Sequence, residues 1–176
     1  MTKQTKLITF SFTLAAIAIL LDRISKAWVM QNIPLYSEIA PIPALKSYLS
    51  LTHSTNSGVA FGLFQGGTLL FTLLAAVAVI AIAVFIFRQG SQSTLMSASL
   101  GLMLGGAVGN LWDRLMYGSV VDFILVRASD TLIWPNFNVA DSAIVVGTGL
   151  LMLYLFLDER RIRQEARHAE QAGNTL

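Results

Sequence analysis

The chain has 176 residues, of which 55% are apolar, 12% are charged and none is cysteine. Soluble domains carry about 25% charged residues, and the mean hydropathy here is +0.65. These values exclude an intrinsically disordered chain and a charge-rich coiled coil, and they disfavour a soluble enzyme. At about 20 residues per crossing, the length allows several membrane spans but no large extramembrane domain. Without cysteine there can be no disulfide, no thiolate nucleophile and no cysteine-ligated zinc ion.

The net charge is +2 and the isoelectric point is about 9.2. The basic residues near the C-terminus follow an apolar stretch, a pattern that favours anionic phospholipid over nucleic acid as the partner. They are Arg160, Arg161, Arg163 and Arg167. The two histidines, His53 and His168, lie far apart in the sequence, so we expect neither a metal site nor a cofactor.

Four apolar stretches are long enough to cross a bilayer. They cover about residues 7–28, 69–87, 95–112 and 139–157. The first resembles a secretory signal peptide, but LLDRISKAW follows it in place of a small-residue cleavage site, which favours an uncleaved span. The pattern predicts one all-α integral membrane domain over residues 1–176, with four transmembrane helices and a basic cytoplasmic tail at 158–176.

The lysines and arginines beside these stretches predict the orientation. With both termini in the cytoplasm, seven basic residues lie inside and five lie outside. The outer five are Arg23, Lys26, Lys46, Arg114 and Arg127. In this orientation all three tryptophans fall at the outer interface, where amphipathic rings prefer to lie: Trp28, Trp112 and Trp134.

The same topology puts both long connections, residues 29–68 and 113–138, on the outer side. In the first loop, SLTHST alternates partly with a two-residue period, which indicates a strand on the membrane surface. In the third span, small residues recur every four positions and predict a face for close helix packing. They are Ser97, Gly101, Gly105 and Gly109.

Polar residues near a membrane are costly and need a reason. Two aspartates at the outer ends of the spans are candidates for catalysis. Asp122 lies in the apolar run GSVVDFILV, where burial favours the protonated form, although an outward-facing acid on a surface strand explains it equally well. Asp141 lies in FNVADSAI, where Asn138 and Asp141 could equally form a plain helix cap. Together, one proton-holding and one ionised carboxyl group could divide acid and base work on a water.

The other polar residues at these ends fit a supporting shell, each with a structural alternative. Asn110 and Arg114 share a helix face if the third span continues that far; Arg114 could bind a carbonyl or a lipid headgroup, or lie beside Asp113. Asp22 and Lys26 have the spacing of a helical ion pair. Asn56 could instead form a simple turn.

Five motifs then occur in order along the chain: DRISK, NSGVAFG, GGAVGNLWDR, GSVVDF and FNVADSAI. From about Leu14 to Leu157 the chain resembles the bacterial lipoprotein signal peptidase (signal peptidase II) family. The resemblance implies an inner-membrane aspartyl endopeptidase that removes signal peptides from diacylglyceryl-modified prolipoproteins by cutting before the lipidated cysteine.

The resemblance also implies roles for particular residues. Asp122 and Asp141 match the catalytic pair, and two further groups match substrate-site and supporting positions. The substrate-site residues are Asn56, Asn110, Arg114 and Asn138, and the supporting residues are Asp22, Lys26 and Asp113. It further implies a four-transmembrane-helix bundle with a periplasmic β-rich cradle and a short outer helix, a site near the periplasmic face, inhibition by globomycin and no cofactor. Nothing in the sequence demands more than a monomer.

Three alternatives remain open on the sequence. A small proton-coupled transporter is supported by intramembrane acids and by the recurrence of LLDR and LWDR, but its second span carries no polar residue beyond Thr72. A serine protease could use Ser57 and His53, although no acid is evident to orient the histidine. A non-catalytic assembly subunit would tolerate the loss of either aspartate.

Overall fold

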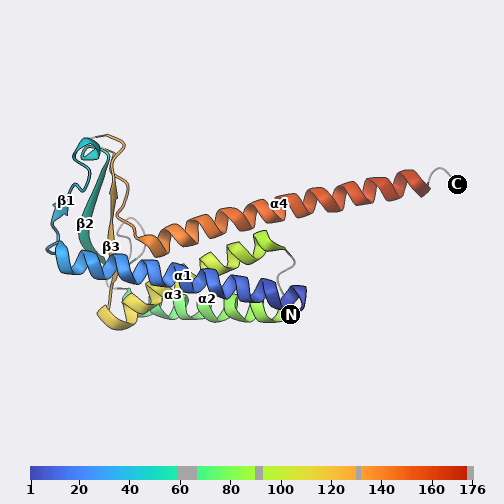
Figure 1. The fold of residues 1–176 in the computed structure, drawn as a ribbon, viewed down its shortest axis with the longest axis horizontal. Coiled ribbons are helices and arrows are strands. Elements are labelled where there is room, and N and C mark those ends of the chain that lie inside the picture. The colour runs from blue at the N-terminus through green and yellow to red at the C-terminus, as the bar shows by residue number, and fades with distance from the viewer. Residues whose placement is uncertain (59–66, 90–92, 130–131, 174–176) are drawn as a thin grey trace.

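The computed structural model describes residues 1–58, 67–89, 93–129 and 132–173. In these residues, four long helices form a bundle and three strands gather at one end of it (Figure 1). The helices are α1 (Lys3–Asn32), α2 (Thr68–Gln89), α3 (Thr94–Tyr117) and α4 (Val139–Gly173). The strands are β1 (Glu38–Ile39), β2 (Leu49–Asn56) and β3 (Val120–Val126), with the 3₁₀ turn η1 (Pro43–Leu45) between β1 and β2. Residues 59–62 of the NSGVAFG motif lie outside the described residues.

Each of the four helices contains an 18-residue segment apolar enough to cross a membrane. At 1.5 Å per residue, even the 22-residue α2 is about 33 Å long, close to the roughly 30 Å of a hydrocarbon core. Its exposed side chains are large and apolar, with Leu69 at 74% and Val77 at 64% exposure. Such a surface requires lipid around it, so the chain is a multi-pass membrane protein.

Two helices are longer than the apolar stretches that predicted them. The third stretch ends near residue 112, whereas α3 continues to Tyr117 and ends at Gly118, whose φ of +72° only glycine adopts at little cost. Asp113 and Arg114 therefore lie on a helix. The fourth stretch ends near residue 157, whereas α4 continues to Gly173 and extends well beyond the bundle (Figure 1).

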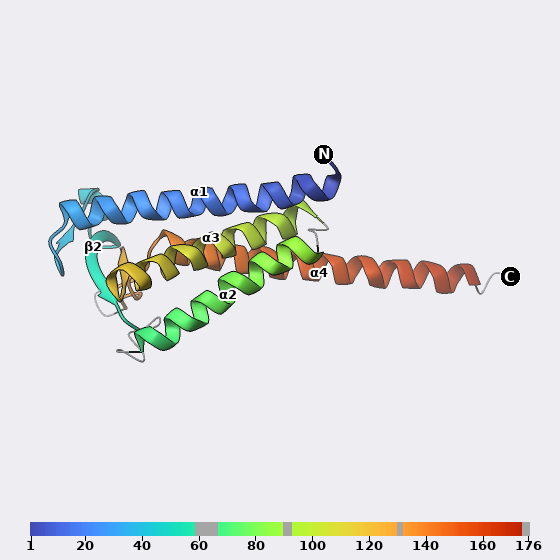
Figure 2. The same ribbon diagram turned by 90° about the horizontal axis from the view of Figure 1, so that it is seen from below.

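The bundle is organised around α3, which packs on both α1 and α4 (Figure 2). As predicted, small residues line its contact with α1: a Cβ on Gly101 would lie 2.5 Å from the Ser11 carbonyl oxygen, and one on Gly105 would lie 2.8 Å from that of Ala15. Gly106, outside the predicted four-residue series, gives the same close approach to α4, because its Cβ would lie 2.3 Å from the Ala140 carbonyl oxygen. Side chains are thus excluded where the three helices meet.

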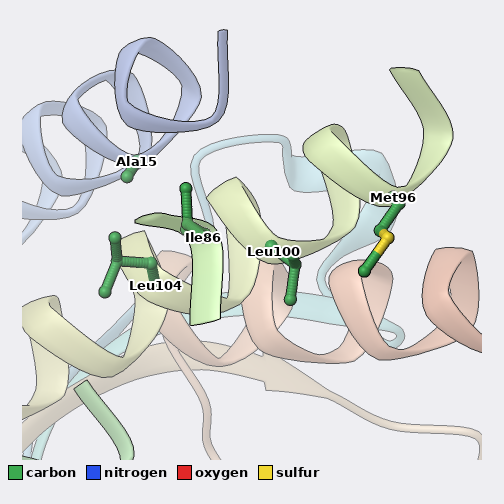
Figure 3. Packing of buried hydrophobic residues seen from close by; sticks show 5 residues of the cluster. All are labelled: Ala15, Ile86, Met96, Leu100 and Leu104. Atoms are coloured by element: carbon green, nitrogen blue, oxygen red, sulfur yellow. The ribbon is translucent and has the colours of Figure 1, made fainter. Parts of the chain in front are cut away.

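Helix α2 joins the bundle through an apolar cluster at the end away from the sheet (Figure 3). Ile86 is fully buried there against Ala15 of α1 and three α3 residues. Those three are Met96, Leu100 and Leu104. The cluster itself is apolar, and the polar side chains buried near it are three serines, whereas the buried charged and amide side chains gather at the opposite end.

At that opposite end, the strands form an antiparallel sheet in the order β1-β2-β3. The predicted strand SLTHST lies within β2, which confirms the strand, and its place on the membrane surface stays a prediction. The β2–β3 register pairs Ser54 with Asp122 and is shifted between Leu51 and Ser54 by an irregularity of the bulge type. The chain after β3 returns beside it, since Phe137 pairs with Ile124. This return places the start of α4 next to β3.

Candidate active site

The predicted site residues gather where the sheet meets α3 and α4, in two adjoining groups. The first group surrounds a cavity of about 600 Å³. Of the predicted residues, Asn56, Asn110, Arg114, Asp122 and Asp141 line it. Asn138 is completely buried beneath it, and the second group (Asp22, Lys26 and Asp113) is buried behind it.

Asp122 reaches the cavity from the middle of β3 and is only 4% exposed. One carboxyl oxygen accepts a hydrogen bond from the Asn138 amide at 2.7 Å and the other accepts one from the Asn56 amide at 3.3 Å. Burial, followed by the negative charge of Asp141, raises the pKa of Asp122 to about 7, against an ordinary value of 3.8. The exposed surface acid considered as an alternative is therefore wrong.

Asp141 is set by the start of α4. Its backbone N–H donates to the Asn138 side-chain oxygen at 2.9 Å, and the Asn138 N–H donates back to the Asp141 carboxyl group at 3.1 Å. This reciprocal pair is the predicted capping box. The second carboxyl oxygen accepts the Asn110 amide at 2.7 Å, and the residue still lines the cavity. The cap thus holds the carboxyl group in the site, so the two interpretations of Asp141 are compatible.

Two asparagines connect the two acids. The Asn138 amide that binds Asp122 also donates to the Asn110 side-chain oxygen at 3.2 Å, and the Asn110 amide binds Asp141. The route Asp122–Asn138–Asn110–Asp141 joins β3, the start of α4 and α3. Because each amide group both donates and accepts, rotation of either carboxyl group is opposed by hydrogen bonds.

Arg114 lies at the rim of the cavity, four residues after Asn110 on α3. Its guanidinium donates to the backbone oxygens of Asn110 at 3.4 Å and Gly58 at 3.3 Å. The Asp113 carboxylate forms its ion pairs with Arg23 and Lys26. Within the described residues the buried Nε of Arg114 has no partner, which leaves the guanidinium a donor for a further group.

Asp22, Lys26 and Asp113 are completely buried and form an ion cluster with the partly exposed Arg23, a member that sequence reasoning missed. Lys26 Nζ lies 2.9 Å from Asp22 and 2.7 Å from Asp113. Arg23 contacts both carboxylates as well, at 2.6 Å to Asp113, and donates to the Gly109 backbone oxygen at 3.2 Å. Charge balance could have indicated this member, because the two carboxylates of Asp22 and Asp113 need a second cation besides Lys26 to form a neutral cluster.

Sequence reasoning also missed Asn136 and Ser54. The Asn136 amide donates to the Ser54 hydroxyl at 2.9 Å, and that hydroxyl donates to the Asp122 backbone oxygen at 2.9 Å. Asn136 lines the cavity as well. The two residues lie 82 positions apart, so no local pattern could connect them. Their bond braces β3 at the residue that carries the site.

The wall of the cavity on the side of α4 is apolar. Ile144, Val145 and Val146 form it, with Val145 71% exposed at the helix surface. Trp134, at 59% exposure, lies at the rim. The polar groups at one side and an open apolar wall at the other suit a substrate that arrives through the bilayer.

The serine-protease arrangement has no support from the described residues. The Nδ1 of His53, which an orienting acid would bind, lies 2.9 Å from the Ile33 backbone oxygen. Nor does any group of three or more His, Asp or Glu side chains in the described part of the chain lie where it could hold a metal ion.

Asp122 makes the stability of the fold depend on pH. Between its ordinary pKa of 3.8 and its folded-state pKa of about 7, the folded protein keeps a proton that the unfolded chain loses. The stabilisation is complete below 3.8 and is lost as the pH rises through 7. We expect the melting temperature of the wild type to fall across this window and that of Asp122→Asn to change less with pH. Above pH 7 the free energy of unfolding of Asp122→Asn should exceed that of the wild type, by a few kcal/mol at most. Identical melting profiles for the two proteins would contradict the burial of an uncompensated carboxyl group.

Comparison of the fold gives the class of protein. Two solved structures of bacterial membrane enzymes, both determined by the in meso method, share it. The first is 27% identical with a TM-score of 0.76 and covers 85% of this chain and 88% of its own. The second is also 27% identical, with a TM-score of 0.71, and covers 82% and 91%. The fold and its polar cavity thus place the chain among membrane-embedded enzymes.

Comparison of the sequence gives the family. The model of signal peptidase (SPase) II matches residues 14–157. A lipoprotein signal peptidase of Symbiobacterium thermophilum is 42% identical over 151 residues, which are 86% of this chain and 97% of the relative. One from Pseudomonas putida is 38% identical over 151 residues, 84% and 86% of the two chains. The chain belongs to the signal peptidase II family and is an aspartic peptidase. This membership disfavours the transporter and the assembly subunit.

Proposed function

We propose that this protein removes the signal peptide from diacylglyceryl-modified prolipoproteins, cleaving before the lipid-carrying cysteine with a water activated between Asp122 and Asp141. The observation that carries the proposal is that two acids from separate elements line one cavity and are joined through two asparagines. The family supplies the reaction class, and its relatives are named for lipoprotein signal peptides.

The two acids have different roles. Asp141 lies at the positive end of the α4 dipole and accepts two hydrogen bonds, from the Asn138 N–H and the Asn110 amide. It is the ionised group, which takes a proton from water as the oxygen attacks the scissile carbonyl carbon. Asp122, with a pKa of about 7, is protonated in about half of the molecules at pH 7, and this protonated form donates to the carbonyl oxygen. When the tetrahedral intermediate collapses, Asp141 gives the proton it took from water to the leaving nitrogen, the C–N bond breaks, and Asp122 takes back its proton as the C=O bond re-forms.

The substrate matches the shape of the cavity. A signal peptide is an apolar segment, and the apolar wall of Ile144, Val145 and Val146 is open at the helix surface. Arg114 at the rim has a donor for a substrate carbonyl or for the oxygens of the lipid headgroup. We also expect bound phospholipid around the bundle, inhibition by globomycin through the same cavity, and a monomer as the active form.

The orientation proposed is that both termini lie in the cytoplasm of a bacterium, with the cavity and a β-rich cradle near the periplasmic face of the inner membrane. Two of the five outer cations, Arg23 and Lys26, are paired with buried carboxylates, so the remaining charge favours this orientation more strongly than the raw count. The three tryptophans lie toward the sheet end and are 46% to 59% exposed, as residues of a membrane interface are.

The test is cleavage of one precursor by the purified protein in phospholipid vesicles, with and without the diacylglyceryl group on its cysteine. We expect cleavage of the modified precursor alone, at the bond before the cysteine, since the lipid anchors the scissile bond at the depth of the cavity. Mass spectrometry of the products gives the bond. Equal cleavage of both forms would contradict the proposed substrate.

A further inference from the structure

The two buried carboxylates behind the cavity each hold the backbone next to one of the two candidate catalytic aspartates. Asp113 accepts a hydrogen bond at 3.1 Å from the N–H of Val121, the residue before Asp122. Asp22 accepts one at 3.0 Å from the N–H of Ala140, the residue before Asp141. Asp113 of α3 therefore holds strand β3, and Asp22 of α1 holds the start of α4 in the same way.

One ammonium group connects these two anchors. Lys26 Nζ lies between Asp22 and Asp113, at 2.9 Å and 2.7 Å, and all three side chains are inaccessible to solvent. Arg23, 21% exposed, bridges the same two carboxylates from the other side. Two acids and two bases make the cluster neutral, as burial at this depth requires.

Stability alone is a weak reason for such a cluster. Burying ions is costly, and apolar residues of similar volume often stabilise a core as well or better. A charged cluster provides instead a fixed geometry, because ion pairs at these distances with no solvent nearby tolerate little displacement. Here that geometry spans from the peptide unit before Asp122 to the peptide unit before Asp141.

We propose that Lys26, with Asp22 and Asp113, is a spacer that sets the separation of the Asp122 and Asp141 carboxyl groups for catalysis. The inference rests on the proposed function, since it treats these two aspartates as the catalytic pair. Lys26, Asp22 and Asp113 are positioning residues: none of them lines the cavity, and the two carboxylates hold the backbone N–H groups of Val121 and Ala140.

The spacer predicts which kinetic constant changes. The proposed substrate contacts are the α4 wall and Arg114, which line the cavity, whereas Asp22, Lys26 and Asp113 do not, so KM should stay within about twofold. A displacement of one carboxyl group by about 1 Å can lower the rate by up to a hundredfold, so kcat should fall at least tenfold.

The experiment uses the double variant Asp113→Asn/Lys26→Met in phospholipid vesicles. It removes the bridge, keeps the cluster neutral and leaves an amide oxygen to accept the Val121 N–H. The matched control is Arg161→Gln/Glu165→Gln, which removes a neutral ion pair from the exposed extension of α4. We expect a lower kcat at unchanged KM in the first variant and wild-type constants in the control. Wild-type kcat in a folded bridge variant, or a parallel change in kcat and KM, would overturn the inference.

A second measurement reports the distance between positions 122 and 141 without an activity assay. It can be used if the double variant is too unstable for kinetics. The chain has no cysteine, so Asp122→Cys/Asp141→Cys introduces two thiols alone, and the rate of their oxidation to a disulfide reports their proximity. Adding Asp113→Asn, which keeps Lys26, should slow this rate severalfold; an unchanged rate overturns the spacer. If Asp122→Asn retains cleavage while the rate slows, the proposed function fails and the spacer does not.

Discussion

Replacing Asp122 or Asp141 with asparagine is expected to lower cleavage of a lipid-modified precursor by at least a hundredfold. The amide keeps the volume of the carboxyl group and can still hydrogen-bond, but it cannot take a proton from water or donate one to the carbonyl oxygen. Both side chains line one cavity and are joined through Asn110 and Asn138. Each substitution therefore removes one of the two groups that transfer protons in the same reaction. The measurement is the initial cleavage rate in vesicles, at matched protein concentration.

A loss of activity must be separated from a loss of folding. Asp122→Asn should melt no lower than the wild type above pH 7, because it removes a buried carboxyl group whose pKa is raised to about 7. Asp158→Asn, on the part of α4 beyond the apolar stretch, is the matched control and should cleave at the wild-type rate. Substantial cleavage by either Asp122→Asn or Asp141→Asn would eliminate the two-carboxylate mechanism.

Much of this site follows from local sequence. The four apolar stretches predict the helices because about 20 apolar residues have few other stable environments. The capping box of Asn138 and Asp141 is a three-residue spacing that depends only on the first turn of a helix. The pairing of Asp22 with Lys26 likewise needs only one turn of α1.

Other parts depend on contacts between distant segments, which no local pattern carries. The bond from Asp113 to the Val121 N–H exists because α3 continues past residue 112 before Gly118 reverses the chain. Among the described residues, the outer loops contain the 3₁₀ turn η1 of three residues, and the short outer helix implied by the family resemblance stays a prediction. The extension of α4 is helical through local ion pairs such as Arg161–Glu165, which hydropathy does not register.

Contacts between distant segments also explain why sequence reasoning missed Arg23 as a member of the ion cluster. Its neighbour Asp22 faces the bundle, and successive helix residues differ by about 100° in direction, so helical spacing alone does not place Arg23 beside Asp113. The long side chain instead turns back to Asp113 and the Gly109 backbone oxygen, because two buried carboxylates exceed the charge of one lysine. Helical spacing gives the direction of a Cβ atom but not the reach of a guanidinium group.

A large effect is also expected from Gly106→Ala, at a residue outside the cavity. Its new methyl group would lie 2.3 Å from the Ala140 carbonyl oxygen and 2.7 Å from the Ile144 side chain, so the backbone of α4 must move away from α3. Asp141 begins the same helix and would move from the Asn110 amide that holds it at 2.7 Å. We expect a loss of roughly 1–3 kcal/mol in stability and a fall in cleavage rate of at least tenfold.

Gly149→Ala on α4 supplies the matched control, because a Cβ there meets no atom within 4 Å. Alanine favours a helix by up to about 1 kcal/mol over glycine, so this variant should be as stable as the wild type or more so, with unchanged activity. Thermal unfolding and initial rates of both variants, measured in the same lipid, compare the two positions directly. If Gly106→Ala behaved as Gly149→Ala does, α3 and α4 would have room between them, and the close contact that holds Asp141 against Asn110 would not exist.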